Sequence, residues 1–309
     1  MESVLQWGLD FIRAVQSAAS PPLTLVMRII TFFGGEPVYI ALLPILYWCV
    51  DEKKGLRLGV VILISTWINI SLKFLFDQPR PFFEAYDPTL DICKIEEKMG
   101  GLPSGHAQNT LVLLIIIASW LKKKWAYICA IILCLLIGFS RIYLGVHFPT
   151  DVFAGWILGG IILCGYFLLA GRIETLLDKG GFRAKVIASA LVSFIMILYL
   201  PGKEILMPAG VLLGLGAGYC LNRRYVGFSS GQTGRTGIEK YLVLPVRFFL
   251  GITGLLLIYI ALGKIFPKDG GNQNLFGFLR YALAGLWVSV AAPWVFVKLR
   301  LGEFKSKEK

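Results

Sequence analysis

The segment WAYICAIILCLLIGF, residues 125–139, is apolar and uncharged throughout, and it directly follows three lysines at 122–124. With the two residues that come after it, this segment would form a helix that crosses most of the ~30 Å hydrocarbon core of a bilayer. Similar apolar stretches, separated by short charged clusters, recur from Pro37 to the end of the chain. This pattern predicts an all-α, polytopic helical membrane protein.

The composition favours a membrane protein over other classes. Hydrophobic residues make up 56% of the chain and charged residues 16%, with a mean hydropathy of +0.71, whereas soluble domains are about half apolar and a quarter charged. The net charge of +12 would suit nucleic-acid binding, but the positive residues lie between apolar segments rather than along one face. We therefore expect membrane lipids as partners and no nucleic acid.

About nine membrane spans are predicted. Their ranges are 37–50, 58–75, 105–121, 125–141, 151–170, 186–200, 205–221, 242–263 and 275–297. Residues 1–20 read as an amphipathic, interfacial helix, and 23–33 as a partly embedded segment too short to cross alone. The predicted organisation is N-terminal interfacial helices at 1–36, a membrane core at 37–171, and additional transmembrane helices with a basic tail at 172–309.

The distribution of Lys and Arg predicts the orientation. Most of the 31 lie in the loops that follow odd-numbered spans, which are 51–57, 122–124, 171–185, 222–240 and 298–309. Because positive loops stay on the cytoplasmic side, we expect these loops and the C-terminus to be cytoplasmic. The loops after even-numbered spans then face the opposite side.

Three polar clusters stand at these even-numbered, non-cytoplasmic loops. They are KFLFDQPRP at 73–81, LPSGHA at 102–107 and SRIYLGVHFPTD at 140–151. Both histidines of the chain, His106 and His147, lie in these clusters. Ionisable residues at the ends of membrane helices are costly and are usually functional.

The residue types in the clusters suit phosphate binding. Lys73, Arg80 and Arg141 can supply positive charge, and guanidinium groups match paired phosphate oxygens. Ser104 and Gly105 open a predicted helix whose free N–H groups favour an anion, with the serine hydroxyl as a further donor.

The two histidines suit phosphoryl transfer. Asp151 lies four residues after His147, so its carboxylate can bind one ring nitrogen and leave the other to attack phosphorus. His106 can then protonate the departing oxygen.

The three clusters resemble the signature of the type 2 phosphatidic acid phosphatase superfamily, Lys-x6-Arg-Pro, Pro-Ser-Gly-His and Ser-Arg-x5-His-x3-Asp. The positions that match in identity and spacing are Lys73, Arg80, Pro81, Pro103, Ser104, Gly105, His106, Ser140, Arg141, His147 and Asp151. The N-terminal arrangement is similar, more loosely, to glucose-6-phosphatases and sphingosine-1-phosphate phosphatases.

This resemblance implies a six-helix phosphatase core, so that the region 37–171 would be catalytic. His147 would form a phosphohistidine, Asp151 would orient it, and His106 would act as general acid and then base. Phosphate would be held by Lys73, Arg80, Ser104, Gly105 and Arg141. The family uses no metal, and we expect no cofactor here.

The expected substrate is a phosphomonoester or diphosphate of a lipid, hydrolysed on the non-cytoplasmic side. A sugar-phosphate phosphatase and a non-catalytic lipid transporter are the alternatives. We favour a bacterial inner membrane over the endoplasmic reticulum, which the basic tail at 305–309 would also suit. The additional helices either form a lipid access path, mediate a homodimer or support the core, and the glycine spacing over 210–218 favours close helix packing.

Overall fold

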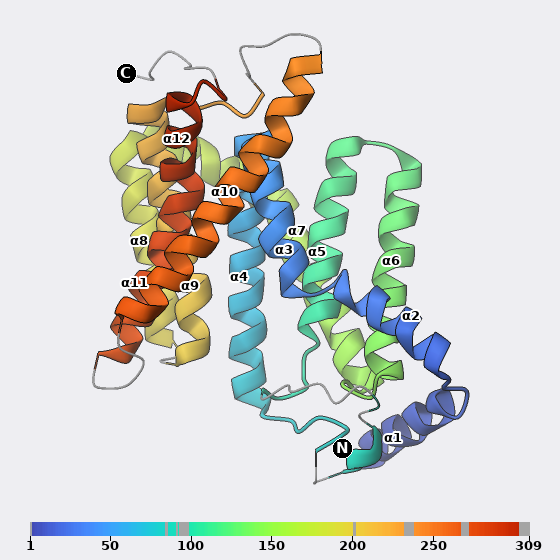
Figure 1. Ribbon diagram of the computed structural model, residues 1–309. Coiled ribbons are helices and arrows are strands. Elements are labelled where there is room, and N and C mark those ends of the chain that lie inside the picture. The colour runs from blue at the N-terminus through green and yellow to red at the C-terminus, as the bar shows by residue number, and fades with distance from the viewer. Residues whose placement is uncertain are drawn as a thin grey trace. The chain divides into compact units, whose positions relative to one another are not determined.

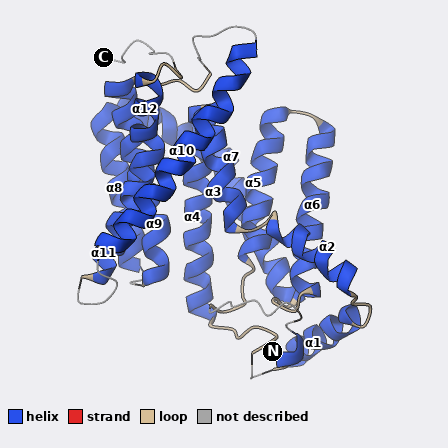
Figure 2. Cartoon of the chain, in the orientation of Figure 1, coloured by secondary structure: helices blue, strands red, loops and turns tan. Residues whose placement is uncertain are grey.

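The computed structural model describes residues 2–83, 86–90, 92, 99–199, 202–231, 238–266 and 272–302. These residues form helices joined by loops, without a strand among them (Figure 2). The predicted all-α class is therefore confirmed. The basic tail at 305–309 lies outside the described residues.

Contacts within the chain divide it into two compact units. Unit 1 comprises residues 1–38 and 68–168, and unit 2 comprises 39–67 and 169–309. Two long helices, α4 (Glu52–Phe76) and α7 (Pro149–Lys179), contribute residues to both units.

Wherever the structure describes them, the predicted apolar segments fall on helices. Seven described helices are long and apolar enough to cross a membrane, and α5 (Gly105–Leu121) is a shorter apolar helix. The segment interpreted as partly embedded forms α2 (Pro21–Phe32), which passes the same test only as a pair with residues 36–50, across a bend of 43°. The prediction of about nine spans is consistent with this count.

In unit 1, α5 and α6 (Lys124–Tyr143) run side by side, and α2 packs across α6 (Figure 1). The amphipathic N-terminal segment forms α1 (Glu2–Gln16). Its Leu9 and Ile12 are buried in a cluster with Phe148 and Val152, while Trp7 on the same helix is exposed. One face of α1 thus covers the loop between α6 and α7, which contains His147.

Unit 2 contains the C-terminal helices. They are α8 (Gly181–Tyr199), α9 (Lys203–Leu221), η3 (Asn222–Val226), α10 (Ile238–Ile265), α11 (Gln273–Leu286), η4 (Trp287–Ala291) and α12 (Ala292–Lys298), together with most of α3 (Glu36–Ile45), and with η1 (Leu46–Val50). Helix α9 packs against α8 and α11. A Cβ on Gly214 would lie 2.0 Å from the carbonyl oxygen of Ala282, so the glycines let α9 and α11 approach closely, as their spacing predicted.

A buried arginine joins separate segments of unit 2. The side chain of Arg247 on α10 is fully buried. Its Nη1 donates to the carbonyls of Trp48 (3.0 Å) and Ser230 (2.8 Å), and its Nε donates to that of Leu301 (2.6 Å). The guanidinium also lies over the Phe228 ring at 5.1 Å. Because carbonyl oxygens receive its N–H groups, this charge is accommodated inside a largely apolar unit.

Candidate active site

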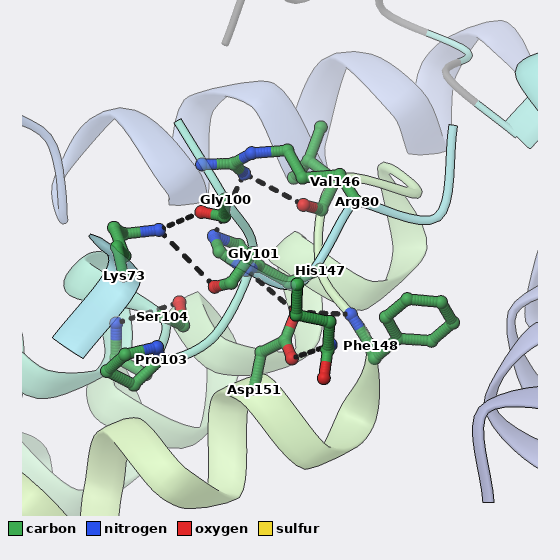
Figure 3. A network of polar contacts seen from close by, with 12 residues as sticks. Lys73, Arg80, Gly100, Gly101, Pro103, Ser104, Val146, His147, Phe148 and Asp151 are labelled. Atoms are coloured by element: carbon green, nitrogen blue, oxygen red, sulfur yellow. Dashed lines mark hydrogen bonds and ion pairs between the residues drawn. The ribbon is translucent and has the colours of Figure 1, made fainter. Parts of the chain in front are cut away.

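The three sequence clusters meet inside unit 1 (Figure 3). Lys73 lies near the end of α4, Ser104 caps α5, and Arg141 lies in the last turn of α6. Arg80 and His147 lie on loops, and Asp151 is in the first turn of α7. Except for His106 and Gly105, which are half-buried, the predicted site residues are buried: Lys73, Arg80, Ser104, Arg141, His147 and Asp151.

His147 and Asp151 form a buried pair. The Nδ1 atom of His147 lies 3.2 Å from Oδ2 of Asp151, and the same oxygen accepts a hydrogen bond from the Phe148 N–H at 3.0 Å. Because the carboxylate is an acceptor, this network assigns the imidazole proton to Nδ1. The lone pair of the neutral ring is then on Nε2, on the side away from Asp151.

Arg80 lies against that lone pair. Its Nη1 is 3.2 Å from Nε2 of His147 and donates to the carbonyl of Val146 at 2.9 Å. Its Nε donates to the carbonyl of Met99 at 2.8 Å. These bonds fix the guanidinium beside the nitrogen that can attack phosphorus, where it would meet the phosphate oxygens.

Lys73 holds the loop that leads into α5. Its Nζ donates to the carbonyls of Gly100 and Gly101 (Figure 3). A Cβ on Gly101 would lie 2.8 Å from Oδ2 of Asp151, so a residue with a side chain does not fit there. The ammonium group and the glycines together bring this loop close to the carboxylate.

The start of α5 is placed by hydrogen bonds from two other segments. The Ser104 N–H donates to the Asp151 carbonyl at 2.9 Å, and the Ser104 side chain caps the helix at the N–H of Ala107. Asn69 on α4 donates from Nδ2 to the Pro103 carbonyl at 3.3 Å, and a Cβ on Gly105 would lie 3.0 Å from its Oδ1. The predicted helix start at Gly105 is confirmed, with its positive end at the site.

His106 and Arg141 border the end of α2. A Cβ on Gly35 would lie 3.7 Å from Nε2 of His106. Arg141 donates from Nη1 to Oγ1 of Thr31 at 3.1 Å. The N-terminal segment therefore contributes to the walls of the site, which the sequence did not indicate.

Burial and nearby positive charges both lower the pKa of His147. His147 lies between the spans formed by α6 and α7, and burial lowers its pKa well below the usual 6.5. The positive charges of Arg80, Lys73 and Arg141, and the nearby His106, lower this pKa further. His147 is therefore neutral near pH 7, which is the form that a nucleophile requires.

Four polar residues of the site were not identified from the sequence: Thr31, Asn69, Gln78 and Gln108. Gln78 donates from Nε2 to Oδ1 of Asp151 at 2.9 Å, and Gln108 accepts from Asn69 at 2.9 Å. Asn69 and Gln108 lie in apolar spans, where an amide is itself a functional signal. Gln78 lies in the first cluster, at a position where the family signature allows any residue. Nothing in the sequence distinguishes Thr31 as a site residue.

Within the described ranges there is no group of three or more His, Cys, Asp or Glu side chains arranged to hold a metal ion. The expectation that the chain uses no cofactor stays a prediction.

Two family models match the chain in order. Residues 54–174 match the PAP2 superfamily, and residues 206–306 match the transmembrane extension of PAP2 superfamily phosphatases. The first match covers all three signature clusters. The second covers most of the additional helices.

Three curated relatives extend these matches. The chain is 34% identical to an undecaprenyl-diphosphatase of Sulfolobus acidocaldarius over 44% of this chain and 66% of that protein. It is 31% identical to phosphatidylglycerophosphatase B of Bacillus subtilis over 50% of this chain and 77% of that protein. It is 24% identical to lipid phosphate phosphatase delta of Arabidopsis thaliana over 87% of this chain and 68% of that protein.

The Bacillus alignment includes more than two thirds of the relative, and this chain has several helices long and apolar enough to cross a membrane. Together with the two family models, it shows that this integral membrane protein belongs to the PAP2 superfamily of phosphatases.

Proposed function

We propose that the chain hydrolyses a phosphomonoester or diphosphate of a lipid at the non-cytoplasmic face of a membrane, through a phosphohistidine intermediate and without a metal. The observation that carries this proposal is the buried pair of His147 and Asp151, with Arg80 against the remaining ring nitrogen. A neutral imidazole in that setting is a nucleophile, and a phosphate beside it would meet several cations.

In the first step, the Nε2 lone pair of His147 forms a bond to phosphorus while the bond from phosphorus to the leaving oxygen breaks. His106 gives its proton to that oxygen, and Asp151 balances the positive charge that develops on His147. The phosphate oxygens contact Arg80, Arg141, Lys73, Ser104 and the Gly105 N–H.

In the second step, water attacks the phosphohistidine. His106 removes a proton from the water, the bond between phosphorus and nitrogen breaks, and inorganic phosphate leaves. The neutral His147 is restored. Because the chemistry consists mostly of positioning and of charge neutralisation, the fixed cations carry much of the rate enhancement.

Two observations support a lipid substrate. The relatives are named for undecaprenyl diphosphate, phosphatidylglycerophosphate and lipid phosphate. In addition, α2, which borders the site, exposes large apolar side chains such as Leu25, Ile29 and Phe32. A phosphate can bind at the helix ends while the hydrocarbon chains remain in the bilayer.

The charge distribution supports the proposed location. Because most Lys and Arg residues lie in the loops after odd-numbered spans, a cytoplasmic C-terminus is favoured, with the three signature clusters on the opposite side. A bacterial inner membrane suits this arrangement.

A substrate panel tests the proposal directly. Purified protein in mixed micelles is given phosphatidate, phosphatidylglycerophosphate, undecaprenyl diphosphate and glucose 6-phosphate, and released phosphate is measured. We expect rates that depend on the surface concentration of the lipid substrates. Saturable hydrolysis of glucose 6-phosphate without lipid hydrolysis would identify a sugar phosphatase, and the absence of any hydrolysis would favour a transporter.

The two histidines should differ in their variants. His147→Ala removes the nucleophile, so no phosphate should be released from any substrate. His106→Ala removes a general acid that contributes ~10²–10⁴-fold, so residual release should persist on p-nitrophenyl phosphate, whose leaving group needs no proton. Equal activity of the two variants on that substrate would contradict the assigned roles.

The pH dependence reports on His147. Since its pKa lies below 6.5, His147 should stay neutral and active as the pH falls through 6.5, and kcat/KM should decline only at lower pH. The profile is corrected for ionisation of the substrate phosphate, and enzyme held at low pH is reassayed at pH 7 to exclude inactivation. A decline on the acidic side of the profile, as the pH falls, that is centred at or above pH 6.5 would refute this assignment.

Thr31 should act through Arg141. Thr31→Val keeps the side-chain volume but removes the oxygen that accepts from the guanidinium, so we expect kcat/KM to fall about tenfold, as for one hydrogen bond to a charged group. Thr31→Ser should restore it. The matched control is Thr24→Val on the same helix, because the Thr24 hydroxyl bonds the Tyr143 hydroxyl at 2.9 Å instead.

A double-mutant cycle separates this role from a general loss of packing. In an Arg141→Gln background, Thr31→Val should cause no further loss. An undiminished tenfold loss in that background would show that Thr31 does not work through Arg141.

A further inference from the structure

The turn between α2 and α3 lies beside the proposed general acid. Helix α2 ends at Phe32 and α3 begins at Glu36. The buried Gly34 and Gly35 between them close the turn, since their N–H groups donate to the carbonyls of Thr31 and Phe32, both at 3.0 Å. His106, which adjoins this turn, is half-buried.

Backbone conformation does not explain the glycine at position 35. The described glycines with a left-handed backbone are Gly145, Gly181 and Gly227. A Cβ on Gly35 would lie 3.2 Å from the Phe32 carbonyl oxygen, 3.5 Å from Cδ of Pro37 and 3.7 Å from Nε2 of His106. Alanine therefore fits after a small adjustment, and the effect of glycine is to leave space beside His106.

The space beside Gly35 lies where the leaving oxygen of the substrate must approach His106. An oxygen that receives a proton from Nε2 of His106 must come within about 3 Å of that nitrogen. A methyl group on Gly35 would stand 3.7 Å from the same nitrogen, and would therefore compete with the leaving oxygen and its first carbon. The neighbouring Gly34 differs, because its Cβ would lie 2.7 Å from Cγ2 of Ile137 and would disturb packing.

The surface next to this space is apolar. Leu25 and Ile29 are four residues apart, and Phe32 and Phe33 follow Ile29 by three and four residues. The four side chains therefore form one stripe that ends at the turn between α2 and α3. Their exposed fractions lie between 50% and 59%. A hydrocarbon chain attached to the leaving oxygen at Gly35 would continue along this stripe.

We propose that Gly35 is a specificity-determining residue that leaves room for the alcohol of the substrate beside His106, with the attached hydrocarbon chain lying along the apolar stripe of α2. The inference rests on the proposed function and deepens it. It assigns the leaving-group side of the site to a segment outside the three signature clusters.

The test compares a large leaving group with a small one in Gly35→Ala. Hydrolysis of phosphatidylglycerophosphate or phosphatidate in mixed micelles requires the space for a lipid alcohol. Exchange of oxygen-18 between water and inorganic phosphate passes through the same phosphohistidine, but its leaving group is only a water molecule. We expect kcat/KM for the lipid to fall about 10- to 100-fold, while the exchange rate stays within about twofold of wild type.

Because the exchange needs an intact His147, His106 and phosphate site, it also shows that the variant is folded. Gly160→Ala on α7 is the matched control, since a Cβ there meets nothing within 4 Å, and it should leave both rates unchanged. A parallel loss of both activities in Gly35→Ala would overturn the proposal, and so would unchanged lipid hydrolysis. A wild-type protein without either activity would refute the proposed function instead.

Discussion

The carboxylate of Asp151 is the constraint on which the site depends. It is fully buried, and a buried carboxylate is tolerated only when its oxygens are hydrogen-bonded or paired. Its oxygens accept from Nδ1 of His147, the Phe148 N–H and Nε2 of Gln78, and its backbone carbonyl accepts from the Ser104 N–H. Satisfying this one residue therefore brings all three signature clusters together.

The side chains of Arg80 and Lys73 also help to hold the loops of the site together. Arg80 and Lys73 direct part of their hydrogen bonding to backbone carbonyls of the surrounding loops, at Val146, Met99 and Gly101 among others. These hydrogen bonds fix the positions of the two cationic side chains and of the loops at the same time. Burial and then these positive charges lower the pKa of His147 and keep it neutral. In the proposed mechanism the same cations also bind the phosphate.

The N-terminal segment contributes to the candidate active site. Helix α1 buries Leu9 and Ile12 against the loop of His147, and α2 supplies Thr31 to Arg141. Unit 2 has its own buried polar centre at Arg247, whose partners are backbone carbonyls. The contacts described for Arg247 hold protein segments together, whereas the polar contacts of unit 1 surround His147, the proposed nucleophile.

The sequence by itself determined the helical membrane class, the positions of the spans and the pairing of His147 with Asp151. These properties are local, because hydropathy is read along one helix. His147 lies in the loop just before α7 and Asp151 in the first turn of that helix, so the two side chains meet across only four positions of the chain. Only the tertiary structure decided that Gln78 contacts Asp151, that Thr31 contacts Arg141, and that Gly35 borders His106. Such contacts join residues about 70 to 110 positions apart. They depend on how each helix is rotated against its neighbours. The apolar pattern of a lipid-embedded helix does not specify this rotation, because lipid and neighbouring helices are both apolar.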